Sequence, residues 1–132
     1  MSEVFILSSL KIDPVTSPIQ EPVKLSFEYA LNNDFKNWKW VIKYTVDIAF
    51  KRIVLDVLHE KSESIASGKY TKDIIIPKIS TEGIADKDLL NVGLLTIYGI
   101  SDNEEMIAIN MVSQITKNEK GELYKTLLSP LE

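Results

Sequence analysis

The most regular pattern of apolar and polar positions lies between Asn91 and Ile115. It predicts two β-strands, at 92–100 and 106–115, joined by a turn at 101–104. Because successive side chains of a strand point to opposite faces, each strand should turn one set of residues toward the core and the other outward. The predicted core set is Leu95, Ile97, Ile107, Ile109 and Met111, and the predicted outer set is Val92, Leu94, Thr96, Tyr98, Ile100, Ala108 and Val112.

The outer set of this predicted hairpin is largely apolar, which is unusual. An antiparallel sheet with one face in water normally carries polar side chains on that face. Two interpretations therefore stay open: another part of the chain covers the second face, or the face is exposed and binds a partner. Gly93 and Gly99 stand alone within the first strand, where a glycine indicates a close backbone approach or a bulge.

The segment before this hairpin contains further strand patterns. The predicted strands cover residues 4–12, 24–31, 38–46 and 70–76. Because only a short polar gap separates the second from the third, these two are predicted to pair as a β-hairpin. Pro14, Pro18 and Pro22 lack an amide hydrogen, so the stretch between the first two strands should be an extended connection or a sheet edge.

Residues 47–59 allow two interpretations. The β-branched run 53–59 favours a strand, but Val46, Phe50, Ile53 and Val57 also fit a helical spacing that Asp47 would cap. We predict the strand. Residues 60–68 are expected to form a polar loop, residues 81–90 to contain a short helical turn, and residues 116–132 to form a C-terminal tail or a short element.

Composition limits the class of protein. A chain of 132 residues with about seven short strands predicts a single all-β sandwich domain spanning 1–132, with at most short helical turns. The net charge of −4 disfavours direct binding of nucleic acid, and the absence of cysteine excludes disulfides and thiolate metal sites. No apolar run approaches the length of a membrane span. We therefore expect a cytosolic or nuclear protein without a nucleic-acid or membrane partner.

The sequence offers little that predicts catalysis. His59 lies beside Asp56 and Glu60 and could act as a general base, but no motif supplies a nucleophile, and a histidine at the rim of the fold is the commoner case. The acidic pair 104–105 sits at a predicted turn, where solvated side chains are usual. A phosphate-binding glycine loop and metal-ligand spacing are absent from the sequence. We expect no enzymatic activity, no cofactor and no metal.

The order of several short motifs resembles a known family. The chain has P-I-Q-E-P at 18–22, L-S-F-E at 25–28 and W-V-I-K-Y at 40–44, where the family has proline-spaced aromatic residues, I-T-F-E and W-K-x-x-Y-V. Its segments 92–96 and 105–109, V-G-L-L-T and E-M-I-A-I, resemble the family's G-V-T-V-x-L and E-F-I-R-V. From about Val4 to Gln114 the chain resembles the anti-silencing-function family of histone H3–H4 chaperones.

This resemblance implies an immunoglobulin-like β-sandwich that is not an enzyme and that acts in nucleosome assembly and disassembly in the nucleus. In the family, outward apolar residues of the sheet receive the C-terminal helices of histone H3 and block its pairing with a second H3–H4 unit. Acidic residues, here Asp88 and Glu105, would steer the basic partner. The histone-binding residues that the resemblance implies are Thr45, Asp88, Val92, Leu94, Thr96, Glu105, Ala108 and Val112.

The chain also departs from the family pattern. Ala108 stands where the family usually has an arginine, and Val112 stands where it has a tyrosine. The alternative is therefore a β-sandwich interaction module with a non-histone partner. Lys36-Asn37 replaces an acidic pair that in the family receives other chromatin-assembly chaperones. Of that second groove, only Val57 and Leu58 would be retained.

Overall fold

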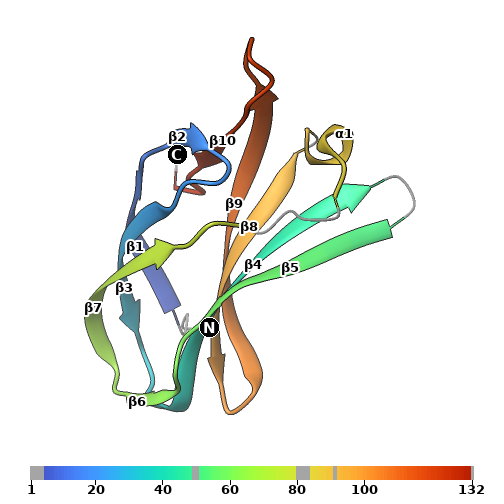
Figure 1. Cartoon of the computed structure of the whole chain (residues 1–132). Coiled ribbons are helices and arrows are strands. Elements are labelled where there is room, and N and C mark those ends of the chain that lie inside the picture. The colour runs from blue at the N-terminus through green and yellow to red at the C-terminus, as the bar shows by residue number, and fades with distance from the viewer. Residues whose placement is uncertain (1–4, 49–50, 80–83, 91, 132) are drawn as a thin grey trace.

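The computed structural model describes residues 5–48, 51–79, 84–90 and 92–131, which form two packed antiparallel β-sheets (Figure 1). The elements are β1 (Phe5–Asp13), β2 (Thr16–Pro18), β3 (Val23–Leu31), β4 (Phe35–Ile48), β5 (Lys51–His59), β6 (Glu63–Ile65), β7 (Gly68–Ile76), α1 (Asp86–Leu89), β8 (Gly93–Ser101), β9 (Glu104–Lys117) and β10 (Leu123–Leu128). The prediction of an all-β sandwich with short helical turns is confirmed.

The strand order is that of an immunoglobulin-like sandwich. One sheet has the order β1-β3-β7, and the other has the order β2-β10-β9-β8-β4-β5, with β6 paired to β4. Strands β1, β3 and β7 correspond to A, B and E of an immunoglobulin domain, and β9, β8, β4 and β5 correspond to G, F, C and C′. In the described part of the chain no helix is long and apolar enough to cross a membrane.

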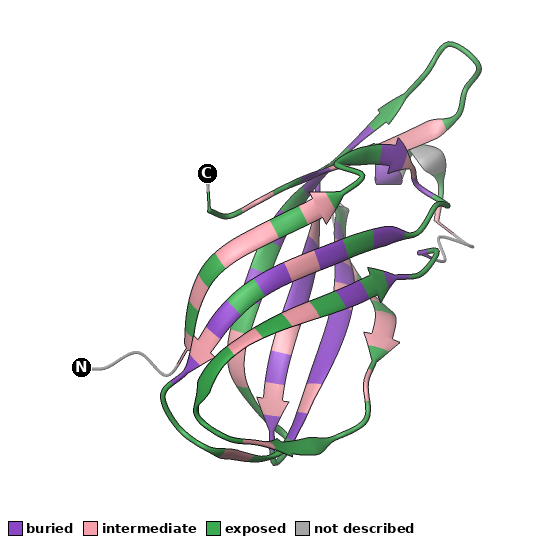
Figure 2. Cartoon of the chain, turned by 90° about the vertical axis from the view of Figure 1, so that its left-hand side faces the viewer, coloured by how far each residue is buried: buried purple, intermediate pink, exposed green. Residues whose placement is uncertain are grey.

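The core lies between the two sheets and is built from alternate residues of each strand. Figure 2 shows buried bands alternating with exposed or intermediate ones along β3, the middle strand of the three-stranded sheet. From the larger sheet, Trp38, Trp40, Ile42 and Tyr44 are each at most 3% exposed. The Trp40 ring meets the rings of Phe27 and Tyr29 in the opposite sheet, with centroid distances of 5.3 and 5.4 Å, in edge-to-face geometry that favours aromatic pairs.

The predicted hairpin between 24–31 and 38–46 is wrong. Strand β3 pairs with β1 and β7, whereas β4 pairs with β5, β6 and β8, so the chain crosses from one sheet to the other between them. Two alternating strands joined by a short gap can meet through backbone hydrogen bonds or through their apolar faces. Here the aromatic side chains of the two strands pack edge to face across the sandwich, so the strands lie in different sheets.

The hairpin predicted between Asn91 and Ile115 is confirmed. Strands β8 and β9 pair from Gly93↔Ser113 to Ser101↔Glu104. Asp102 and Asn103 have φ angles of 49° and 66°, which is the backbone of a type I′ turn. Of the predicted core set, Leu95, Ile97, Ile109 and Met111 are buried. The fifth, Ile107, is only partly buried and packs against the core.

Several other predictions can be compared with the structure. The strand at 53–59 is confirmed against the helical alternative; Phe50, on which that alternative depended, lies outside the described residues.

The proline-spaced segment contains edge strand β2, as predicted. The polar loop 60–68 contains the short strand β6, and the predicted tail contains β10, which pairs with β9. The helical turn expected within 81–90 is α1; residues 81–83 lie outside the described part.

Gly99 marks the close approach expected from its isolated position in a strand. A Cβ atom there would collide with the ring of Trp38 and with Ile107 Cγ1. We expect Gly99→Ala to lower the free energy of unfolding by about 1–3 kcal/mol, because the aromatic core must shift to make room. Urea unfolding followed by tryptophan fluorescence measures this change. Ala108→Val, which adds volume on the exposed face, should change stability by less than about 0.5 kcal/mol; equal losses in the two variants would contradict the close packing.

Candidate functional site

One row of side chains crosses the outer face of the seven-stranded sheet. Thr45 on β4 lies opposite Val54 on β5 and Leu94 on β8; Leu94 lies opposite Val112 on β9, and Val112 lies opposite Leu128 on β10. We call Val54, Thr45, Leu94, Val112 and Leu128 the apolar row. With neighbouring strands about 4.8 Å apart, the row is about 19 Å long.

Alternation with the core explains why this row points outward. Tyr44 and Val46 flank Thr45, Gly93 and Leu95 flank Leu94, and all four flanking residues are buried. Side chains between two inward residues of a strand must face the other side of the sheet. The orientation of the row is therefore a direct consequence of how the core is filled.

The apolar row is in contact with solvent. Val54 is 50% exposed, while Val112 and Leu128 are each 39% exposed. Val92, which directly precedes β8, is 59% exposed, and Leu94 and Thr45 are half-buried. Of the two interpretations that the sequence left open, the structure supports an exposed face rather than one covered by the chain itself. An exposed apolar surface of this kind is typical of a protein-binding site.

A row of polar side chains, Lys43, Thr96 and Asn110, lies beside the apolar row, and these side chains bond to groups within the chain. Thr96, opposite Lys43 and Asn110, is only 2% exposed, and its Oγ1 donates a hydrogen bond to Asn110 Oδ1 at 2.9 Å. The Lys43 Nζ atom lies 4.0 Å from Asp56 Oδ1 and 6.0 Å from the centre of the Tyr98 ring. Thr96 was expected to contact a partner, but in this structure its side chain is covered by its neighbours.

The remaining residues of the implied histone site are spread over the face. Ala108 lies opposite Tyr98 and is exposed. Glu105 is exposed but lies opposite Ile100, six residues along β8 from Leu94 and therefore about 20 Å from the apolar row. Asp88 belongs to α1, and its side chain lies outside the described part of the chain. The row is thus formed by Thr45, Leu94 and Val112 of the predicted set, with Val92 just before β8.

The residues proposed for a second groove occupy a different position. Val57 and Leu58 on β5 are half-buried and pack against the hydrophobic core. The pairing of β4 with β5 is interrupted beside them, where Ile42 pairs with Leu58 and Lys43 with Asp56, so that Val57 is the extra residue of a bulge. Both side chains therefore stabilise the edge of the sandwich and offer little free apolar surface to a partner.

Two residues of the apolar row were not identified as binding residues from the sequence. Alternation within the predicted strand 53–59 places Val54 on the face opposite to Ile53. The outward direction of Val54 could therefore be predicted from the sequence. Leu128 could not be found in this way, because its position depends on β10 being a strand that pairs with β9.

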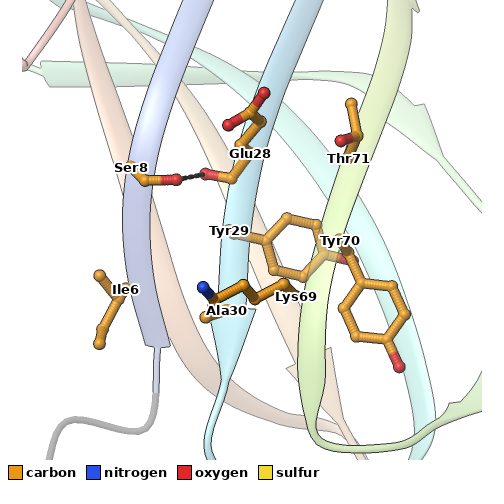
Figure 3. A pocket seen from close by; sticks show the side chains of 8 residues that line it. All are labelled: Ile6, Ser8, Glu28, Tyr29, Ala30, Lys69, Tyr70 and Thr71. Carbon is orange, nitrogen blue, oxygen red and sulfur yellow. Dashed lines mark hydrogen bonds between the residues drawn. The ribbon is translucent and has the colours of Figure 1, made fainter.

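A hollow of about 510 Å³ lies over the three-stranded sheet (Figure 3). It is lined by Ile6, Ser8, Glu28, Tyr29, Ala30, Lys69, Tyr70 and Thr71. The Ser8 hydroxyl donates to the backbone oxygen of Glu28 at 3.1 Å, so it is not paired with a base that would activate it.

His59 lies elsewhere, more than half exposed, with Nε2 3.5 Å from Asp56 Oδ1. Among the described residues no cluster of three metal-ligating side chains occurs.

Comparisons with known proteins do not assign a family to this chain. No family model matches it, and no curated protein is similar enough in sequence to count as a relative. Among solved structures, the chain is similar to the Pseudomonas fluorescens alkylpurine DNA glycosylase AlkC bound to DNA containing an abasic site analog, with 14% identity and a TM-score of 0.35. That match covers 82% of this chain and 30% of the glycosylase, and likeness at this level defines neither fold nor function.

The phenol of Tyr29 gives a pH-dependent prediction. Burial, and then the nearby Tyr70, Glu63 and Glu60, raise the pKa of Tyr29 from 10.0 to about 12. The folded chain therefore holds this proton more tightly than the unfolded chain does. The resulting stabilisation is fully present below pH 10 and is lost as the pH rises toward 12.

We expect Tyr29→Phe to remove one late-titrating phenol from the ultraviolet absorbance titration. Between about pH 10 and 12 the free energy of unfolding of Tyr29→Phe should also fall less than that of the unmodified chain, by on the order of 2 kcal/mol. Tyr98→Phe, on the outer face, serves as the matched control. Burial also raises the pKa of Tyr44, so one late-titrating phenol should remain in Tyr29→Phe. An unchanged number of late-titrating phenols in Tyr29→Phe would contradict the assignment to Tyr29.

Proposed function

We propose that this chain is a non-enzymatic, histone-chaperone-like protein that binds histone H3–H4 through the apolar row. The observation that carries the proposal is the solvent exposure of four apolar side chains, Val54, Val92, Val112 and Leu128, on or beside one row of the sheet. The motif order that resembles the anti-silencing-function family directs the choice of partner. A nuclear location and a role in nucleosome assembly and disassembly would follow.

Burial of the apolar row by an apolar partner surface is the proposed mechanism. A row about 19 Å long matches a helix of about 13 residues lying across the strands. Interface energy concentrates in a few central, well-buried side chains, each worth about 2 kcal/mol or more. Leu94 is at the centre of the row, with two residues on either side, and is the first candidate for such a role.

Charges near the row are mostly paired within the chain. Lys43 approaches Asp56 to 4.0 Å, and Arg52 Nε donates to Asp47 Oδ1 at 2.8 Å. The hydrogen bond to Asp47 raises the pKa of Arg52. Because these pairs nearly cancel, attraction of a basic partner would come from the overall charge of −4 rather than from the row itself. Added salt should therefore lower the association rate constant of the complex more than it lowers the affinity.

A second candidate function keeps the same face but a different partner. Ala108 is exposed and offers only a methyl group where the resemblance implies an arginine. Val112 supplies a smaller apolar contact than the tyrosine of the family, and it is part of the row itself. Both differences favour a partner that is met by apolar contact alone, which need not be a histone.

Replacing the centre of the row tests the proposal. We expect Leu94→Arg to weaken binding of purified H3–H4 by about 30-fold or more, because a charge would be buried at the centre of the interface. Ile75→Arg, at a site that is 66% exposed on the opposite sheet, is the matched control and should bind as the unmodified chain does. Isothermal titration calorimetry measures both. Absence of H3–H4 binding, or equal affinity of the two variants, would contradict the proposal.

Restoring the two family residues separates the two candidate partners. If histones bind this face, the double variant Ala108→Arg, Val112→Tyr should bind H3–H4 at least as tightly as the unmodified chain does. Where both new side chains contact the histones, the affinity should rise by about tenfold. Pull-down with mass spectrometry would identify a different partner. If the double variant lost a non-histone partner and gained nothing toward H3–H4, the second candidate function would stand in place of the first.

A further inference from the structure

Lys125 lies on β10 with its side chain turned into the molecule, and only 1% of the residue is exposed. Its Nζ donates hydrogen bonds to three backbone oxygens: Pro18 O at 2.9 Å, Ile19 O at 3.3 Å and Glu21 O at 2.7 Å. An ammonium group has three N–H donors, so all of them are used. This side chain therefore connects β10 to a segment more than 100 residues earlier in the chain.

The surroundings of the ammonium group are those of a built cation site. Burial lowers the pKa of Lys125, and the carboxylate of Glu21 opposes this shift. The carbonyl oxygens compensate the cost of removing the charge from water. If the ammonium group were lost, the buried Ile19 oxygen and the partly buried Glu21 oxygen would lose this donor, whereas Pro18 O would keep its hydrogen bond from Glu21 N. Leaving a buried oxygen unpaired costs more than an ordinary hydrogen bond contributes.

The other hydrogen bonds that cross the described seam between β2 and β10 join uncharged groups. Strand β2 contains three residues, and its buried Ser17 has no hydrogen-bond partner for its hydroxyl among the described residues. Three residue pairs join β2 to β10, and the Thr16 and Thr126 hydroxyl oxygens lie 3.0 Å apart across the seam. Two backbone hydrogen bonds also cross it, from Ile19 N to Leu123 O at 3.0 Å and from Leu127 N to Val15 O at 3.1 Å. The Lys125 ammonium is thus the most strongly bonded group of this seam.

The position of the seam links it to the apolar row. Strand β10 pairs with β9 on one side and with β2 on the other, and it carries Leu128 opposite Val112. Released from β2, strand β10 would be held to the sheet from one side only. Leu128 would then be held at the end of the row by the pairing of β10 with β9 alone.

We propose that Lys125 is a positioning residue: its ammonium group closes the seam between residues 15–21 and β10 and thereby fixes Leu128 in the partner-binding row. The first half of this inference concerns the chain alone. The second half rests on the proposed function, since it concerns binding of a partner by the row.

Hydrogen exchange of Ile19 and Leu127 amides, followed by NMR in the full chain, tests the first half. We expect both amides to exchange about tenfold faster or more in Lys125→Ala and in Lys125→Met, whereas amides between β4 and β8 stay protected. Propylammonium chloride, which replaces the missing atoms of Lys125→Ala, should restore protection; tetramethylammonium chloride, which has the charge but no N–H donor, should not. Unchanged exchange, or equal effects of the two salts, would overturn the inference. Lys120→Ala, in the same hairpin, is the control variant.

Binding of H3–H4 by the same variants tests the second half. We expect Lys125→Ala to lose affinity several-fold, propylammonium to restore it, and Leu128→Arg to lose affinity with the seam still protected. If Lys125→Ala did not fold, Lys125→Met would test closure of the seam by hydrogen exchange, and Leu128→Arg would test the role of the row in binding. If the seam amides of Lys125→Ala exchanged faster but its affinity for H3–H4 were unchanged, the link between Lys125 and the apolar row would be overturned. The exchange result holds even if H3–H4 proves not to be the partner, so the two proposals fail separately.

Discussion

Packing of aromatic side chains between the two sheets is the interaction on which the rest of the structure depends. The Trp40 ring on β4 meets Phe27 and Tyr29 of β3 edge to face, and Trp38 continues the cluster at 5.4 Å from Trp40. Once these residues point inward, the two-residue period of β4 determines the direction of the side chains between Trp38 and Val46. Thr45 must then face outward, and pairing with β8 and β9 places Leu94 and Val112 beside it.

Alternation allowed much of this arrangement to be predicted from the sequence. The β8–β9 hairpin, its inner and outer residues and the strand at 53–59 all follow from local periodicity and turn residues. Pairing between strands far apart in the chain does not. Strands β3 and β4 have the pattern of a hairpin, yet their aromatic residues pack across the sandwich instead. The position of Leu128 and the contacts of Lys125 were inaccessible because they depend on β10 joining β9 and β2.

The structure brings together only part of the set of binding residues that the sequence predicts. Thr45, Leu94 and Val112 come together as a row because adjacent strands align them, whereas Glu105 is displaced along the sheet toward the β8–β9 turn. Thr96 shares the outward direction, but its hydrogen bond to Asn110 and its larger neighbours remove it from solvent. Direction can be read from a period, but exposure depends on the size of the side chains around a residue.

The apolar row is uncovered in the isolated chain, and we propose that a partner covers it. Methyl NMR with a soluble paramagnetic agent tests it most directly, because the agent broadens only signals that it can approach. We expect the methyl signals of Val54, Val112 and Leu128 to broaden in the free chain and those of Leu95, Ile97 and Ile109 to stay sharp. When H3–H4 is added, the first group should become protected. Methyl signals of the row that are already protected in the free chain, or that stay broadened in the presence of a bound partner, would contradict it.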